Sequence, residues 1–190
     1  MMAKQIQQNW EPVLRPQLRE TISLKGIGMT ILNVVNDNPL IDGRQSARAM
    51  MVRKGVQILL HDMRHAVLPE FVLPNGRRAD LITVSDKGEI WIVEIKTSIE
   101  DFRIDRKWPE YRAYCDRLIF ATHKDVPLEI FPQDCGLLLS DGYGAHLLSD
   151  APVHKLAPAT RKSLMLDFSR AAAHRLMMAE WSTGRSFDDV

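Results

Sequence analysis

Two carboxylates and a lysine occur where β-strands would bring them together. The runs ADLITVS and EIWIVEIK are rich in Ile, Val, Leu and Thr, and the turn sequence DKG (residues 86–88) separates them. A three-residue hairpin loop with glycine last is common, because that position requires the left-handed conformation. In this register Asp80 faces Glu94, and Arg78 faces Lys96. Alternate side chains share a face, so all four are predicted to cluster at one end of one face.

This cluster permits two interpretations, an ion-pair network or a metal site. In the first, Asp80 pairs with Arg78 and Glu94 pairs with Lys96, since unpaired charges are costly to bury. In the second, the facing carboxylates bind a hard cation such as Mg²⁺, which prefers oxygen ligands, and the carbonyl group of Ile95 adds a third oxygen. Lys96 would then position or deprotonate the water that attacks a phosphate. Hairpin geometry alone leaves both interpretations open.

The same residues resemble a known family. Asp80, followed after a strand turn by Glu94-Ile95-Lys96, is the pattern of the PD-(D/E)XK nuclease superfamily. The segments GRRADL, IWIVEIK and DFRIDRKWPEYRAYCDRLIFA further resemble the MmcB-type bacterial DNA-repair proteins, and this resemblance spans residues 41–181. One residue departs from the superfamily pattern, because Ala79 stands where proline is usual. Alanine suits the interior of a strand and leaves Asp80 in place.

The resemblance implies an α/β fold with a restriction-endonuclease-like core, in which a helix, a three-strand meander, a helix and a strand build a mixed central sheet. The largely apolar faces of the hairpin indicate helices on both faces of the sheet, and a C-terminal hairpin and helix follow. The implied activity is DNA hydrolysis in repair, with Mg²⁺ or Mn²⁺ held by Asp80, Glu94 and Ile95. The alternative is a catalytically silent nucleic-acid-binding or accessory repair module on the same fold.

Local patterns place the other elements around the hairpin. The sequence predicts helices over 46–63, 98–108, 109–116 and 158–181, strands over 66–73 and 117–121, and a hairpin over 136–149. The strand over 117–121 should run parallel to the strand that carries Glu94, because helices connect the two. Trp108 is expected to belong to the core.

Glu70 is a further candidate, and its placement depends on the first turn of the meander. A three-residue loop of residues 74–76 makes Glu70 face Asp80, whereas a two-residue Asn-Gly turn points it to the opposite face. The superfamily often supplies a glutamate from its first helix. Residues 47–61 contain no acidic residue, so the resemblance makes Glu70 the substitute. Alternatively, Glu70 is a polar residue on an edge strand, where Pro69 also belongs.

Contacts with DNA must come from local basic patches, because the formal net charge of the 190-residue chain is only +1. Arg103, Arg106 and Lys107 follow the strand that ends at Lys96, so they are expected near the carboxylates as phosphate contacts, together with Arg78. Arg48 lies on the first helix, within a stretch of residues 42–66 that holds five basic and two acidic residues. Trp108 or Tyr111 is the candidate for stacking on a base, and pairing within the helix is the alternative.

Composition indicates one ordinary domain. The chain is 45% hydrophobic and 26% charged, and residues 1–40 are expected to be a flexible N-terminal extension before a single domain over 41–190. Two cysteines are too few for a disulfide framework or a zinc knuckle. No apolar run is long enough to span a membrane, and no signal-peptide core is evident, so a cytoplasmic location without membrane contact is expected. DNA is the expected partner, with other repair proteins and a homodimer left open.

Overall fold

Residues 46–182 are described by a computed structural model, and the predicted N-terminal extension lies outside them. Along the chain the elements are α2 (Ala47–Asp62), β1 (Ala66–Val72), β2 (Arg78–Val84), β3 (Ile90–Ile95), α3 (Ile99–Ile104), the 3-10 helix η1 (Trp108–Tyr114), β4 (Arg117–Thr122), the 3-10 helix η2 (Leu128–Ile130), β5 (Gly136–Ser140), β6 (Ala145–Ser149) and α4 (Pro158–Ser182).

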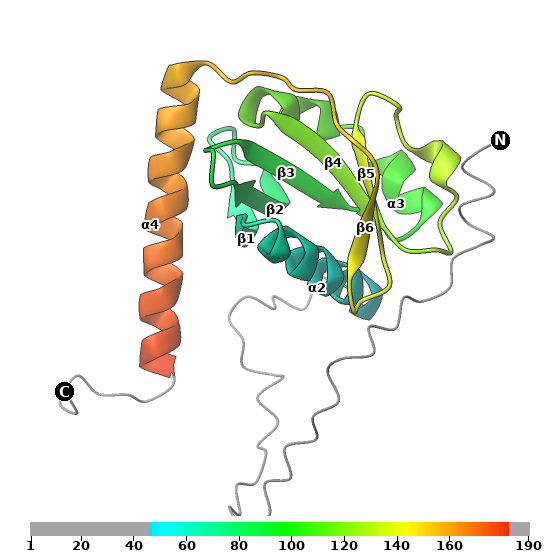
Figure 1. Ribbon diagram of the computed structural model, residues 1–190, viewed down its shortest axis with the longest axis horizontal. Helices are drawn as coiled ribbons and strands as arrows, with labels where there is room; N and C mark the ends of the chain where they lie inside the picture. The colour runs from blue at the N-terminus through cyan, green and yellow to red at the C-terminus, as the bar shows by residue number, and fades with distance from the viewer. Residues whose placement is uncertain (1–45, 183–190) are drawn as a thin grey trace, which may run out of the picture.

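The six strands form one mixed sheet in which spatial order follows chain order from β1 to β6 (Figure 1). β1, β2 and β3 are antiparallel neighbours, β4 lies parallel to both β3 and β5, and β6 returns antiparallel to β5. α3 and η1 lie between β3 and β4 in the chain, as a parallel connection requires. The predicted order of helix, three-strand meander, helix and strand is therefore confirmed, as are the C-terminal hairpin and helix.

Three-residue turns fix the register of the meander. In the β2–β3 turn Gly88 has a φ of +76°, and the Ser85 N–H donates to the Glu89 carbonyl at 2.9 Å. In the β1–β2 turn the glycine has a φ of +79°, and the Leu73 N–H donates to the Arg77 carbonyl at 2.7 Å. Each turn uses glycine at the position where a side chain would disfavour the left-handed backbone. The three-residue alternative for the first turn is thus confirmed.

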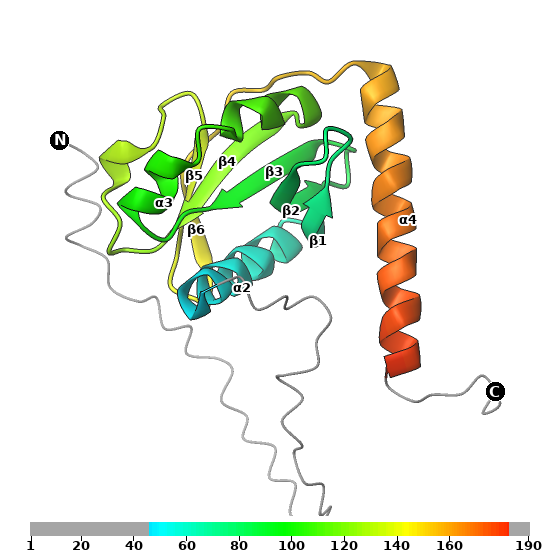
Figure 2. The same cartoon turned by 180° about the vertical axis from the view of Figure 1, so that it is seen from behind.

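α2 covers one face of the sheet and lies beneath the strands in Figures 1 and 2. Its apolar stripe of Val52, Val56 and Leu60 is fully buried. These side chains share a core cluster with residues of the sheet, among them Leu81, Trp91, Val93, Ile95, Ile119 and Ala121. Ser46 begins the helix as predicted, because its Oγ accepts a hydrogen bond from a backbone N–H of the first turn.

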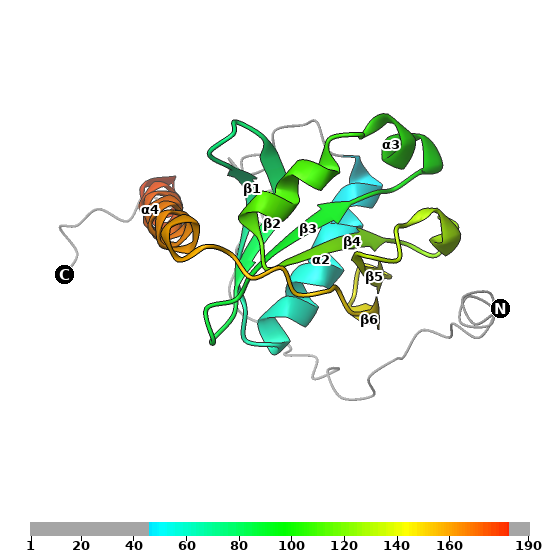
Figure 3. The same ribbon diagram turned by 90° about the horizontal axis from the view of Figure 1, so that it is seen from above.

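Residues of α3, η1 and α4 pack in the second core cluster, which contains Ile82 of β2, Ile92 of β3 and Phe120 of β4. The rings of Phe102 in α3 and Trp108 in η1 meet the Phe120 ring edge-on, each with centroids 5.4 Å apart. In Figure 3, seen from above, η1 lies over the strands and α2 beneath them. The predictions of helices on both faces and of a core position for Trp108 are therefore confirmed.

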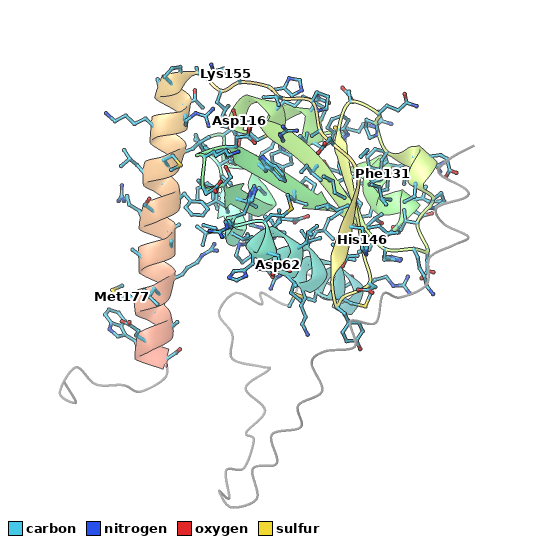
Figure 4. All side chains as sticks on the ribbon, in the orientation of Figure 1. Asp62, Asp116, Phe131, His146, Lys155 and Met177 are labelled. Carbon is cyan, nitrogen blue, oxygen red and sulfur yellow. The ribbon has the colours of Figure 1, made fainter. Side chains whose placement is uncertain are left out.

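A buried carboxylate ties α4 to the sheet. Asp116, labelled in Figure 4, directly precedes β4. Its two oxygens accept hydrogen bonds from the guanidinium group of Arg161 at 2.6 and 2.7 Å. The same carboxylate accepts the N–H of Ile90 in β3 at 2.8 Å and the N–H of Leu156 at 3.2 Å. The first half of α4 is held by this network, whereas its second half extends past the sheet beside β1 (Figures 1 and 4).

Two predictions about the segment after β3 are wrong. α3 ends at Ile104 instead of reaching residue 108. Asp105 leaves helical geometry (ψ 85°), and its side chain makes hydrogen bonds outside the helix. The second short helix, predicted over 109–116, is present as the 3-10 helix η1. Tyr111 cannot stack on a base, because it is buried and its hydroxyl group donates to the Arg78 carbonyl at 3.1 Å.

Cys115 and Cys135 are both buried free thiols. Burial raises the pKa of the Cys115 thiol to about 12 and that of Cys135 to about 11, so both stay protonated at neutral pH. None of the helices within residues 46–182 is long and apolar enough to cross a membrane.

Candidate functional site

The carboxylates of Asp80 and Glu94 meet across the β2–β3 hairpin. β2 and β3 pair in the predicted register, in which Leu81 lies opposite Val93. The Asp80 N–H donates to Oε1 of Glu94 at 3.2 Å, and the Ile95 N–H donates to Oδ2 of Asp80 at 2.8 Å. Each carboxyl group therefore contacts the backbone of the opposite strand through one oxygen, and these bonds do not involve the other oxygen.

Lys96 lies beside this pair, and the structure adds a third acid that the sequence analysis missed. The Lys96 side chain is 6% exposed, and its Nζ lies 3.5 Å from Oε2 of Glu94 and 2.5 Å from Oδ2 of Asp105. Asp105 is the residue that ends α3, and its Oδ1 accepts the N–H of Lys107 at 3.0 Å. The chain thus returns from α3 to the site, and Asp105 contacts the ammonium group of Lys96 together with Glu94.

Glu70 lies at the same level of the sheet as Asp80. The flanking residues of β1 pair with β2 in one continuous register, Pro69 with Leu81 and Phe71 with Ala79. The Glu70 side chain is 12% exposed, and its Oε2 lies 2.6 Å from Nε of Arg78, although the two atoms are not aligned as a hydrogen bond. With Asp105, four carboxylates and two cations therefore lie at this end of the meander.

Burial raises the pKa of both carboxyl groups of the pair. Burial raises the pKa of Asp80 to about 6, although the Ile95 N–H and Lys96 oppose the shift. Burial and the charge of Asp80 hold the pKa of Glu94 well above its ordinary value. Burial alone would lower the pKa of Lys96, but Glu94 and Asp105 outweigh it and the net shift is upward. Without a further cation the carboxylate pair therefore retains protons at a pH where free carboxylates lose them.

This charge balance predicts how stability depends on pH without metal. A carboxyl group whose pKa is raised by folding binds more protons in the folded state, so the contribution of Asp80 to stability falls as pH rises from about 4 to about 6 and then levels off. For Asp80 the loss should be about 3 kcal/mol, since its pKa rises by about two units and one unit is worth about 1.4 kcal/mol. Asp105 and Asp116 have lowered pKa values, so they change the pH dependence of stability below pH 4, outside this window.

The measurement is chemical denaturation of wild type and Asp80→Asn between pH 4 and 8 in the presence of a chelator. The difference in unfolding free energy between the two proteins should shift in favour of Asp80→Asn as the pH rises. A difference that is independent of pH would mean that Asp80 ionises in the folded protein as it does in an unfolded chain.

The predicted DNA contacts fall into two places. Arg103, Arg106 and Lys107 are exposed and lie on the segment that carries Asp105, the acid that contacts Lys96. Arg78, whose side chain is 40% exposed, also lies at the site. Arg48 lies instead in the first turn of α2, the helix on the opposite face of the sheet, 4.0 Å from the carboxylate of Asp125.

The donor set fits a cation that keeps several waters. Among residues 46–182 no group of three or more His, Cys, Asp or Glu side chains is arranged to hold a metal ion. Two facing carboxylates are too few for a closed zinc or calcium site. Mg²⁺ is commonly bound through one or two carboxylates, with water or substrate oxygens completing its octahedron. Raised pKa values for Asp80 and Glu94 are what such a buried pair should have when no cation is bound.

Fold and site together define a class of protein, a mixed α/β protein whose central hairpin buries a carboxylate pair beside a lysine. Residues 36–183 match the family described as DNA repair protein MmcB-like. The chain therefore belongs to the MmcB-like family of DNA repair proteins. It is also similar to a solved structure, the SPO1766 protein of unknown function from Silicibacter pomeroyi, with 36% sequence identity and a TM-score of 0.70. That match covers 75% of this chain and 98% of the other. No curated protein matches the chain.

Proposed function

We propose that the protein is a metal-dependent deoxyribonuclease that acts in DNA repair. One observation carries the proposal, namely that Asp80 and Glu94 face each other in a buried position beside Lys96. A purely structural ion-pair cluster would balance its charges, whereas here burial holds the pKa of both carboxyl groups above the ordinary range. The PD-(D/E)XK pattern and the order of helix, meander, helix and strand support the same function.

Asp80, Glu94 and the carbonyl group of Ile95 would hold Mg²⁺ or Mn²⁺. The backbone hydrogen bonds fix one oxygen of each carboxyl group, and this orients the other for a ligand. When bound, the cation would neutralise the carboxylates and polarise the water and phosphate oxygens of the reaction. Glu70 would add a further negative charge at the rim, within reach of Arg78.

Lys96 would act on the phosphate as a positioned cation. Without metal its pKa is raised, so the ammonium group is protonated at neutral pH. Asp105 and Glu94 hold the group in place, and its positive charge suits the negative charge that develops on a phosphate during hydrolysis. Of the two predicted roles for Lys96, this geometry supports positioning of the water and phosphate rather than deprotonation.

One observation favours the silent DNA-binding module as a second candidate. Nζ of Lys96 lies closer to Asp105, at 2.5 Å, than to Glu94, at 3.5 Å, so Asp105 neutralises much of the charge that catalysis would use. The two functions are separated by incubating the protein with single-stranded, duplex, flap and branched DNA in Mg²⁺, in Mn²⁺ and in chelator. Cleavage of at least one DNA with Mg²⁺ or Mn²⁺, but not with chelator, supports the nuclease. Binding without cleavage of all four supports the module.

Replacing Arg103, Arg106 and Lys107 together by alanine should weaken DNA binding and its salt dependence. Each phosphate contact contributes about 0.9 to the slope of log K against log salt, so the slope should fall by up to about three units. The measurement is fluorescence anisotropy with labelled DNA between about 50 and 200 mM salt. Over this range phosphate contacts have a large effect on affinity.

The matched control removes three exposed positive charges from elsewhere, Lys155, Lys162 and Arg170. It changes the net charge by the same amount, so it should lower affinity slightly and leave the slope nearly unchanged. An equal fall in slope for both triple variants would show that only net charge matters, and that the segment after α3 makes no specific phosphate contacts.

A further inference from the structure

A single guanidinium group binds the backbone of β1 beside the site. Arg175, in the second half of α4, donates from Nη1 to the carbonyl group of Pro69 at 2.5 Å and from Nη2 to the carbonyl group of Glu70 at 3.0 Å. β1 is an edge strand, so its outer backbone groups face away from the rest of the sheet. Arg175 therefore connects α4 to the sheet edge at the residue that lies level with Asp80.

Binding two consecutive carbonyl groups requires a departure from strand geometry. In a regular strand successive carbonyl groups point to opposite sides, so one side chain cannot reach both. Glu70 has a φ of +50°, within the left-handed region that residues other than glycine rarely adopt. The pairing of β1 with β2 keeps one register before and after Glu70, so the left-handed residue does not insert an extra residue into β1. The two contacts of Arg175 and the left-handed backbone at Glu70 thus form one arrangement.

This arrangement fixes the direction in which the Glu70 side chain leaves the backbone. Its carboxylate lies 2.6 Å from Nε of Arg78 and is close enough to Asp80 for its charge to act on that carboxyl group. We propose that Arg175 is a positioning residue that holds Glu70 in the left-handed conformation and so keeps a third carboxylate at the Asp80–Glu94 site. α4 then completes the site from outside the sheet. The proposal rests on the proposed function for the role of Glu70 toward a metal.

The first test needs neither metal nor DNA. Backbone ¹³Cα and ¹³C′ chemical shifts of Glu70 report its φ and ψ in isotope-labelled protein. In Arg175→Met, which keeps a long apolar stem without the fork, these shifts should move toward extended values. Arg175→Lys keeps the charge but offers a single ammonium group, so it should shift Glu70 in the same direction. Arg170→Met, at an exposed position of the same helix, should leave Glu70 unchanged.

Unchanged Glu70 shifts in both Arg175 variants would overturn the proposal, because Glu70 would then hold its conformation without the fork. If the methionine variant fails to fold, the lysine variant still provides the test, since it preserves the charge and the packing of the stem. Amide shifts of α2 and β4 serve as the internal check that the remainder of the domain is intact.

The second test is calorimetric titration with Mn²⁺. Arg175→Met should weaken Mn²⁺ binding about tenfold, the usual effect of losing a residue that orients a ligand. Glu70→Gln should weaken it to a similar degree, and the double variant should bind no more weakly than Glu70→Gln alone. Additive losses would show that Arg175 acts on the site by another route. If wild type binds no Mn²⁺, the nuclease proposal fails, while the Glu70 shifts still decide whether Arg175 sets the backbone.

Discussion

Asp80→Asn and Glu94→Gln should each abolish metal-dependent DNA cleavage while preserving the fold. Both changes keep the shape of the side chain and remove the charge that would hold the cation. Loss of residues that only orient a metal ligand costs about 10- to 100-fold, so loss of a ligand should cost at least about a hundredfold in rate. Initial cleavage rates on the preferred DNA, measured across a range of Mg²⁺ concentrations, check the expectation.

The same variants should be more stable than wild type without metal at pH 8. Each removes one of two buried carboxylates that face each other, and like charges in that position repel. Mg²⁺ should raise the melting temperature of wild type by mass action and should do so far less in either variant. Thermal melts with chelator and with Mg²⁺ measure both effects in one experiment.

Glu110→Gln is the matched control for these two variants. Glu110 is an exposed acid that pairs with Arg77 at 2.6 Å, so its loss changes the net charge equally without touching the buried pair. It should leave cleavage and the effect of Mg²⁺ on melting unchanged. Wild-type activity in Asp80→Asn and Glu94→Gln would refute the metal site. Absence of any metal effect on wild type, together with no cleavage of any DNA, would favour the silent module.

Lys96→Met should lose cleavage by at least about a hundredfold and should also be strongly destabilised without metal. The side chain is almost fully buried between Glu94 and Asp105, and removing one partner of a buried ionic cluster costs about 3 to 5 kcal/mol. The destabilisation should be smaller at pH 5 than at pH 8. Glu94 has a raised pKa, so at the lower pH it can take up a proton in place of its lost cation.

Denaturation of Lys96→Met at both pH values, with Mn²⁺ titration of the folded protein, tests this expectation. Mn²⁺ binding should persist, since Lys96 is not a ligand, and it should restore part of the stability. Lys107→Met removes an exposed lysine nearby and should match wild type in stability. Asp105→Asn should slow cleavage less than Lys96→Met does, because the ammonium group remains. Wild-type cleavage by Lys96→Met would exclude a catalytic role for this lysine.

The sequence alone was enough to place the central hairpin and its charged residues. A glycine in each turn and two alternating strands determine which residues face each other, so the positions of Asp80 and Glu94 follow from local pattern. The parallel course of β4 follows from the helical connection before it. Such features depend on few residues that are near in the chain, which is why pattern reasoning reached them.

The supporting contacts of the site could not be predicted in this way. Asp105 reaches Lys96 only because α3 ends after six residues and the chain turns back, a detail of loop geometry. Arg175 is more than a hundred residues from the β1 carbonyl groups that it binds, and no local pattern connects them. The left-handed backbone at Glu70 has no glycine to signal it. The contacts of Arg175 and the backbone at Glu70 follow from the packing of α4 against the sheet edge, and the contact of Asp105 follows from the loop after α3.

The chain order of the sheet has a consequence for how the protein is made. Each strand pairs with the strand synthesised just before it, so the sheet can grow from β1 to β6 as the chain leaves the ribosome. α4 is synthesised after all of them, and it brings the Arg161 that pairs with Asp116 and the Arg175 that binds β1. A nascent chain can therefore assemble its sheet before it can fasten the helix that positions Glu70. The contacts of Arg161 and Arg175 would then form only when translation of this domain is nearly complete.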